Sequence, residues 1–132
     1  MATTRDILNA IVDEKALALF DTIAKAEYDS DLLIAKLGLS RKEYYMRISR
    51  LMKAGLTSRK SGMYSLTLLG KIVYQAQLTI DHAVNICPKL KAVDLLEKSS
   101  EIPEEERNKV INFLLGNDPI KNIFLQESCR QD

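Results

Sequence analysis

The chain has 132 residues, of which 46% are hydrophobic and 28% are charged, so it has the composition of a folded domain with an apolar core. No apolar run approaches the roughly 20 residues that a membrane helix needs, and the first residues lack the apolar segment of a signal peptide, so we expect a cytoplasmic protein without a membrane span. Two cysteines and one histidine are too few for a disulfide framework or a transition-metal site, and we expect no metal and no cofactor.

The net charge of +1 is unevenly distributed along the chain. Basic residues exceed acidic ones by seven in residues 41–80, where Glu43 is the only acid, whereas the segments on either side each carry a net charge of −3. A basic segment between acidic flanks favours a negatively charged partner such as nucleic acid. Solvated basic faces are common, so this distribution alone changes the odds only modestly.

Two short helices are predicted first. Apolar side chains recur at three-residue spacing in residues 16–26, which indicates an amphipathic helix. A second helix is predicted over residues 31–37. Asp29 or Ser30 can cap its first turn, and Gly38 can end it in a left-handed conformation.

A third helix follows directly. Ser40 and Glu43 have the spacing of a capping box, and the helix continues until Gly55 stops it. The side chains with the spacing of a buried stripe are Tyr44, Ile48 and Leu51. A two-turn helix, a turn with glycine and a longer helix form a helix-turn-helix pattern.

The periodicity changes after the third helix. Residues 56–60 and 63–66 are predicted as two strands joined by the two-residue turn Ser61-Gly62, which makes a hairpin in the position of a wing. Thr67 is expected to cap a long helix over residues 68–87, which Pro88 should close because the residue before proline disfavours helical geometry.

Three more helices are predicted in the last third of the chain. The first covers residues 89–98, the second lies between Pro103 and Gly116, and the third runs from Asp118 toward Gln126. The predicted fold class is therefore mainly α: a winged helix-turn-helix with a small β-hairpin wing and additional C-terminal helices. Residues 14–87 would form the winged domain with its long helix, and residues 88–132 a helical extension for dimerisation or packing.

Three motifs in this order resemble a known group of proteins. They are LGLS at residues 37–40, LMKAGL at 51–56 and GMYSLTLLG at 62–70. This stretch resembles the winged helix-turn-helix transcriptional regulators of the MarR, PadR and ArsR type, and it looks most like their small archaeal members. The Cys and His clusters of an ArsR-type metal sensor are absent. The resemblance implies a regulator that binds double-stranded DNA sequence-specifically, without identifying an effector.

The predicted helix phase selects the residues for DNA contact. The third helix would enter the major groove, and the wing would meet the backbone or the minor groove. Arg41 and Arg47 lie nearer the core flank, so they suit phosphate anchoring, and Tyr64 would brace the hairpin. The full predicted set is Ser40, Arg41, Lys42, Tyr45, Met46, Arg47, Ser49, Arg50, Lys53, Arg59, Lys60, Ser61 and Tyr64.

The long helix after the wing carries a heptad pattern. Apolar residues alternate at spacings of four and three along one face. These residues are Leu69, Val73, Ala76, Ile80, Ala83 and Cys87. We expect this seam to join a homodimer, although it could instead pack against residues 90–96 or 110–115 of the same chain.

Two other functional classes were weighed against DNA binding. A winged helix can be a protein–protein interaction module in a transcription or chromatin assembly without direct DNA readout, because fold does not fix function. An enzyme is not expected, since the sequence has neither a glycine-rich phosphate loop nor a cluster of metal ligands.

Overall fold

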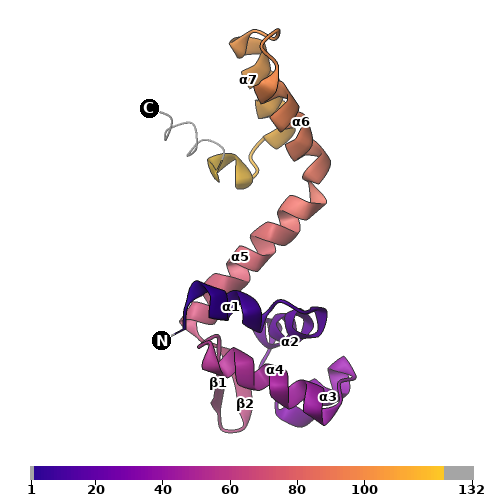
Figure 1. The fold of residues 1–132 in the computed structure, drawn as a ribbon, viewed down its shortest axis with the longest axis vertical. Coiled ribbons are helices and arrows are strands. Elements are labelled where there is room, and N and C mark those ends of the chain that lie inside the picture. Colours follow the sequence, from indigo (N-terminus) through magenta and orange to yellow (C-terminus); the bar gives the residue numbers. More distant parts are fainter. Residues whose placement is uncertain (1, 124–132) are drawn as a thin grey trace. The chain divides into compact units, whose positions relative to one another are not determined.

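The computed structural model describes residues 2–123 (Figure 1). Contacts divide the chain into two units, residues 1–77 and 78–132. This division falls inside the long helix α5, Leu68–Asn85, ten residues before the boundary that the sequence predicted. Within the described part of the chain, no helix combines the length and the apolar character that crossing a membrane requires.

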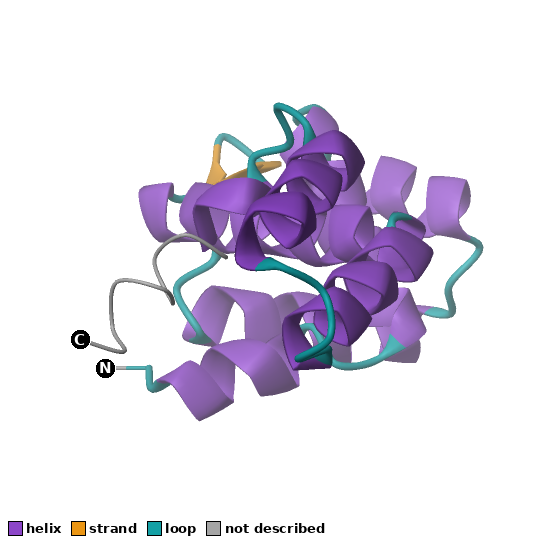
Figure 2. Cartoon of the chain, turned by 90° about the horizontal axis from the view of Figure 1, so that it is seen from above, coloured by secondary structure: helices purple, strands orange, loops and turns teal. Residues whose placement is uncertain are grey.

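The first unit has the order of elements of a winged helix, with helices ahead of one small hairpin (Figures 1 and 2). Its elements are α1 (Thr4–Ala10), α2 (Glu14–Lys25), α3 (Ser30–Leu37), α4 (Arg41–Lys53), β1 (Thr57–Lys60), β2 (Met63–Leu66) and the beginning of α5. The two strands pair antiparallel. The predicted fold class is confirmed.

Local signals set the ends of α3 and α4 as predicted. The Asp29 side chain accepts the Leu32 N–H and caps α3, and Gly38 ends that helix at φ 63°, where glycine has no steric penalty. Both bonds of the capping box at α4 are present: the Ser40 hydroxyl accepts the Glu43 N–H, and the Glu43 carboxylate accepts the Ser40 N–H.

The core of the first unit lies beneath α4. The largest fully buried side chains are Phe20, Leu19, Leu33, Tyr44, Leu51 and Leu56. The predicted stripe of α4 is confirmed, because Tyr44 and Leu51 are fully buried and Ile48 is 3% exposed. The Tyr44 hydroxyl donates to Ser30 Oγ at 2.9 Å, which satisfies its polar atom, and burial raises the pKa of Tyr44 to about 12.

The wing hairpin has the predicted two-residue turn. Ser61 and Gly62 both have positive φ values, 54° and 80°, as a tight turn between twisted antiparallel strands requires. The Tyr64 N–H donates to the Tyr28 carbonyl at 2.9 Å, and these two residues form an isolated antiparallel bridge. The backbone between α2 and α3 therefore holds the hairpin in place.

The start of α5 packs closely on the residue that precedes β1. The Thr67 hydroxyl oxygen accepts the Gly70 N–H at 3.0 Å, as the predicted cap requires, and its O–H donates to the Gly55 carbonyl. A Cβ at Gly70 would lie 2.0 Å from the Leu56 carbonyl oxygen. Only glycine allows this approach of helix to backbone.

Two predicted helix boundaries need correction. The helix α1 was not predicted, although Thr3 and Asp6 form a capping box that opens it. The helix α6 spans Cys87–Lys98, so Pro88 lies in its first turn instead of closing α5, which already ends at Asn85. Proline is tolerated there because first-turn amides have no helical partner.

The second unit contains a helical hairpin of α6 and α7 (Glu104–Leu115). Its buried cluster consists of Val93, Ile111 and Leu115, with Leu90, Leu96 and Leu114 packed against it. Pro103 and Gly116 flank α7, as predicted. Residues 120–123 are helical, and the remainder of the last predicted helix, to Gln126, lies outside the described residues.

We expect Gly70→Ala to lower the stability of the first unit strongly, because the added methyl group meets a backbone atom that cannot move aside. The cost should be about 3 kcal/mol or more. Thermal denaturation followed by circular dichroism measures it. The matched control is Gly38→Ala, whose Cβ would meet nothing within 4 Å, so only the left-handed backbone should cost about 1 kcal/mol. Equal losses in the two variants would contradict the close approach.

Candidate nucleic-acid interface

One face of α4 is exposed opposite its buried stripe. Most of the predicted contact residues of α4 lie on it. The exposed ones are Ser40, Arg41, Lys42, Tyr45, Met46, Arg50 and Lys53, and Ser49 is half-buried. Tyr45 is 51% exposed although the adjacent Tyr44 is fully buried, so the predicted helix phase is confirmed. The Ser40 hydroxyl oxygen is committed to the capping box.

Ion pairs hold α4 against the beginning of α2. Arg47 Nε lies 2.9 Å from Asp13 Oδ1, and Arg47 Nη1 donates to the Glu43 carbonyl at 3.0 Å. Lys15 pairs with the Glu43 carboxylate. The Arg47 side chain is 12% exposed. We therefore correct its assignment as a phosphate anchor: Arg47 fixes the position of α4 and is not available to a phosphate.

The two acids beside α4 are ionised and neutralised by these partners. Burial raises the pKa of Asp13, but hydrogen bonds from the Ala16 N–H and from Arg47 lower it further, so the net pKa lies below its ordinary value. The hydrogen bond from Lys15, followed by those from Ser40, lowers the pKa of Glu43 to about 2. The unpaired charges on the exposed face of α4 are consequently positive.

The tip of the wing adds further exposed cations. Arg59, Lys60 and Ser61 are all exposed, as the prediction required of contact residues. The guanidinium carbon of Arg59 lies 5.7 Å from the centre of the Tyr64 ring, within the range of a cation–π contact. Tyr64 itself is only 4% exposed. We therefore correct its place among the DNA contacts, whereas its expected role as a brace of the hairpin fits the geometry.

We name these exposed side chains on α4 and the wing the basic face. Its members are Arg41, Lys42, Tyr45, Met46, Ser49, Arg50, Lys53, Arg59, Lys60 and Ser61. Both elements belong to the first unit, and α4 contacts β1 directly (Figure 1). Sequence reasoning missed Asp13 and Lys15, which position α4. No short-range pattern reveals them, because they pair with residues 34 and 28 positions away.

Exposed apolar side chains run along α5. In the predicted seam, Leu69 is 40% and Ile80 62% exposed, whereas Val73 packs against the core of the first unit. Ala76 is exposed, and Ala83 and Cys87 are half-buried. Further exposed apolar residues of this helix are Leu68, Ile72, Leu78 and Val84. The apolar surface thus extends beyond the predicted heptad, which Val73 interrupts.

Metal binding has no support within the described range: His, Cys, Asp and Glu side chains of residues 2–123 form no group that could hold an ion.

No protein-family model matches the chain, and no curated protein sequence matches it. Among solved structures, the chain is similar to the crystal structure of NolR from Sinorhizobium fredii. The identity is 25%, the match covers 57% of this chain and 79% of that chain, and the TM-score is 0.49. The winged-helix assignment therefore rests on the elements and contacts described above.

Truncating the two adjacent tyrosines should have opposite consequences for stability. Tyr44→Ala removes a fully buried aromatic ring and should cost about 3 kcal/mol. Tyr45→Ala removes an exposed ring whose edge-to-face contact with Tyr44, at 5.0 Å between centroids, is worth at most about 1 kcal/mol. Urea denaturation of both variants measures the difference. A larger loss for Tyr45→Ala would contradict the phase of α4.

Proposed function

We propose that the chain is a transcriptional regulator that binds double-stranded DNA sequence-specifically, as a cytoplasmic protein without enzymatic activity. The observation that carries this proposal is the basic face. Six cations on α4 and the wing are exposed, and none of them makes an ion pair with an acid among the described residues. These cations are Arg41, Lys42, Arg50, Lys53, Arg59 and Lys60.

The dimensions of α4 suit the major groove of B-DNA, where the four base pairs present distinct patterns of donors and acceptors. Lys42, Ser49 and Arg50 can hydrogen-bond to base edges, and the Tyr45 ring can contact a thymine methyl group. Arg41 and Lys53 can hold phosphates on either side. Such phosphate contacts fix the orientation of the helix without specifying sequence.

The wing would contact the adjacent backbone or the minor groove through Arg59, Lys60 and Ser61. The stacking of Arg59 on Tyr64 favours an extended position of the guanidinium at the tip of the hairpin. Because the hairpin is tied to Tyr28 and to α5, its distance from α4 is fixed within the first unit. A fixed spacing between two contact elements is what binding to two neighbouring grooves requires.

A protein–protein interaction module remains the second candidate, on one observation. Three large apolar side chains of α4 are exposed: Tyr45 at 51%, Met46 at 42% and Met52 at 41%. Aromatic residues and methionine are enriched at protein interfaces. The DNA titration described next separates the two candidates.

Charge reversal at Lys42 and Arg50 should abolish DNA binding without unfolding the protein, because both side chains are exposed. Removal of Arg59 and Lys60 should weaken binding to all sequences about equally. It should also reduce the slope of log K against log salt by about 1 for each phosphate that the variant no longer neutralises. Fluorescence anisotropy of labelled random duplexes at two salt concentrations measures both effects.

The control is charge reversal at Lys91 and Lys109, which are exposed on α6 and α7 and change the net charge equally. This control should bind like the parent apart from a weak general effect of net charge. If the control and the Lys42 and Arg50 variant lost affinity equally, the basic face would not be the binding surface. Parent-like affinity in both double variants of the basic face would leave the interaction module as the function.

We also propose that two copies associate through α5. A helix with exposed Leu68, Ile72, Ile80 and Val84 leaves apolar area in water that a second copy could cover. A two-fold pair would double the contacts with DNA and set half-sites one or more helical turns apart. Ala76 would allow two such helices to approach closely.

Ile80→Asp should convert this dimer into a monomer at micromolar concentration, because a carboxylate would be buried without a partner. Sedimentation velocity measures the mass. Asn85→Asp places the same charge at another exposed position of α5, outside the heptad seam, and should remain dimeric. A monomeric parent with intact helix content would exclude the dimer and favour coverage of the stripe by another segment of the same chain.

A further inference from the structure

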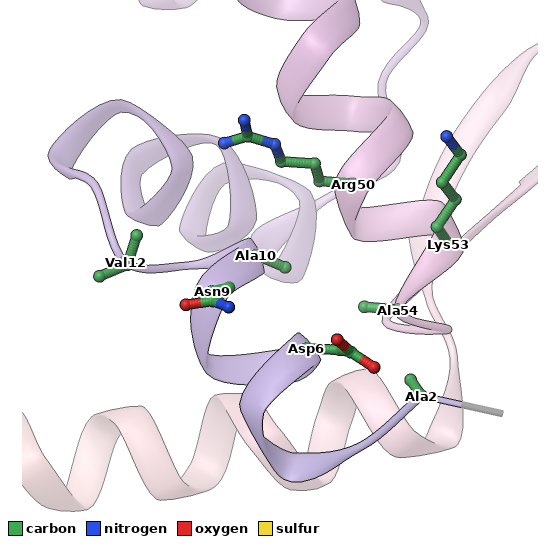
Figure 3. Close-up of a pocket in the computed structure, with 8 residues that line it drawn as sticks. All are labelled: Ala2, Asp6, Asn9, Ala10, Val12, Arg50, Lys53 and Ala54. Carbon is green, nitrogen blue, oxygen red and sulfur yellow. The ribbon is translucent and has the colours of Figure 1, made fainter.

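A cavity of about 690 Å³ lies in the first unit between α1 and the C-terminal part of α4 (Figure 3). This volume is within the range of small-molecule sites in proteins. The cavity is formed by a helix that the sequence did not predict, so no sequence motif pointed to it. Its position connects it to the basic face, because α4 supplies one of its walls.

The two walls carry complementary polar groups. The α4 wall bears Arg50 and Lys53, and the α1 wall bears Asp6 and Asn9 (Figure 3). The methyl groups of Ala10 and Ala54, which are 3% and 5% exposed, provide an apolar floor. Neither cation makes an ion pair within the described residues.

Asp6 is ionised and only partly used by its own helix. Its Oδ2 accepts the Thr3 N–H at 2.9 Å, and this bond is the main reason that the pKa of Asp6 lies below its ordinary value. No hydrogen bond to Oδ1 occurs within residues 2–123. The α1 wall thus offers a charged acceptor, whereas the α4 wall offers only charged donors.

We propose that this cavity binds a small organic acid that carries a second, hydrogen-donating group, as an amino acid or a hydroxy acid does. The ligand carboxylate would pair with Arg50 and Lys53, and its ammonium or hydroxyl group would donate to Asp6. The short carbon chain between them would lie over Ala10 and Ala54. A simple fatty acid would leave the Asp6 charge facing an apolar tail, and a simple amine would meet two cations.

The position of the cavity gives this ligand a regulatory effect, which rests on the proposed DNA binding. Arg50 and Lys53 belong to the basic face, so a bound carboxylate would occupy two of the cations that DNA needs. Ligand and DNA would therefore compete, and each would lower the affinity of the other by the same factor. The ligand would release the regulator from its DNA site.

The binding step is tested on the full chain without DNA, by NMR of the Ala10 and Ala54 methyl groups. The probes are glycine, γ-aminobutyrate and ε-aminocaproate, which vary the spacing of the two charges, and ω-hydroxycaproate. Caproate and hexylamine are the analogues that lack one group. We expect saturable shifts at both methyl groups for the probe of matching length, with a Kd about tenfold lower than for either analogue.

Asp6→Asn identifies the donor end of the ligand. Asparagine keeps an acceptor for the Thr3 N–H but removes the charge, so this variant should bind ε-aminocaproate and caproate with similar affinity. The matched control is Asp31→Asn, an exposed acid in the first turn of α3 outside the cavity, which should keep the preference of the parent. Absence of saturable shifts with every probe, or an Asp6→Asn variant with an unchanged preference, would overturn the site.

The regulatory step is tested by DNA titration in the presence of the best probe. Saturating ligand should raise the Kd for duplex DNA about tenfold or more in the parent, and much less in Asp6→Asn at the same concentration. Binding of the probe with an unchanged Kd for DNA would overturn the regulatory effect. If the parent bound no DNA at all, the proposed function and its regulation would both fail, whereas the methyl titration would still decide whether the cavity binds the ligand.

Discussion

The first unit depends on the burial of one stripe of α4. Tyr44, Ile48 and Leu51 must leave water together, and a helix that buries this stripe has only one orientation about its axis. The hydrogen bond from the Tyr44 hydroxyl to Ser30 adds a directional constraint, because a buried hydroxyl without a partner would be costly. The same rotation that buries the stripe brings Lys42, Tyr45 and Arg50 to the surface.

Polar contacts then fix what rotation alone leaves free. The pairs Arg47–Asp13 and Lys15–Glu43 join α4 to the start of α2, so α4 cannot slide along its own axis without breaking them. A backbone bridge from Tyr28 and the hydroxyl of Thr67 hold the hairpin and α5 in the same way. The exposed cations of α4 and the wing therefore project from a rigid support, and such rigidity reduces the entropy lost when a partner binds.

The arrangement of charges also accounts for the cavity beside α4. Acids that face the core side of α4 are paired, which leaves Arg50 and Lys53 available both to a groove of DNA and to a ligand held by α1. A single pair of cations with two possible partners is a simple way to couple two binding events, because no conformational change has to be transmitted. The apolar surface of α5 stands apart from this coupling and concerns the association of copies.

Signals within a few residues of one another determined much of this fold. The caps at Asp29 and Ser40, the turn at Ser61-Gly62 and the spacing of the α4 stripe depend on local hydrogen bonds and on helix geometry, so the sequence alone specified them. The tertiary structure decided which polar residues are already taken. Arg47 looked like a phosphate anchor until Asp13, 34 positions away, was seen to pair with it. Tyr64 and Val73 likewise turn toward the core, because burial depends on neighbours that are distant in the chain, and no local pattern specifies those neighbours.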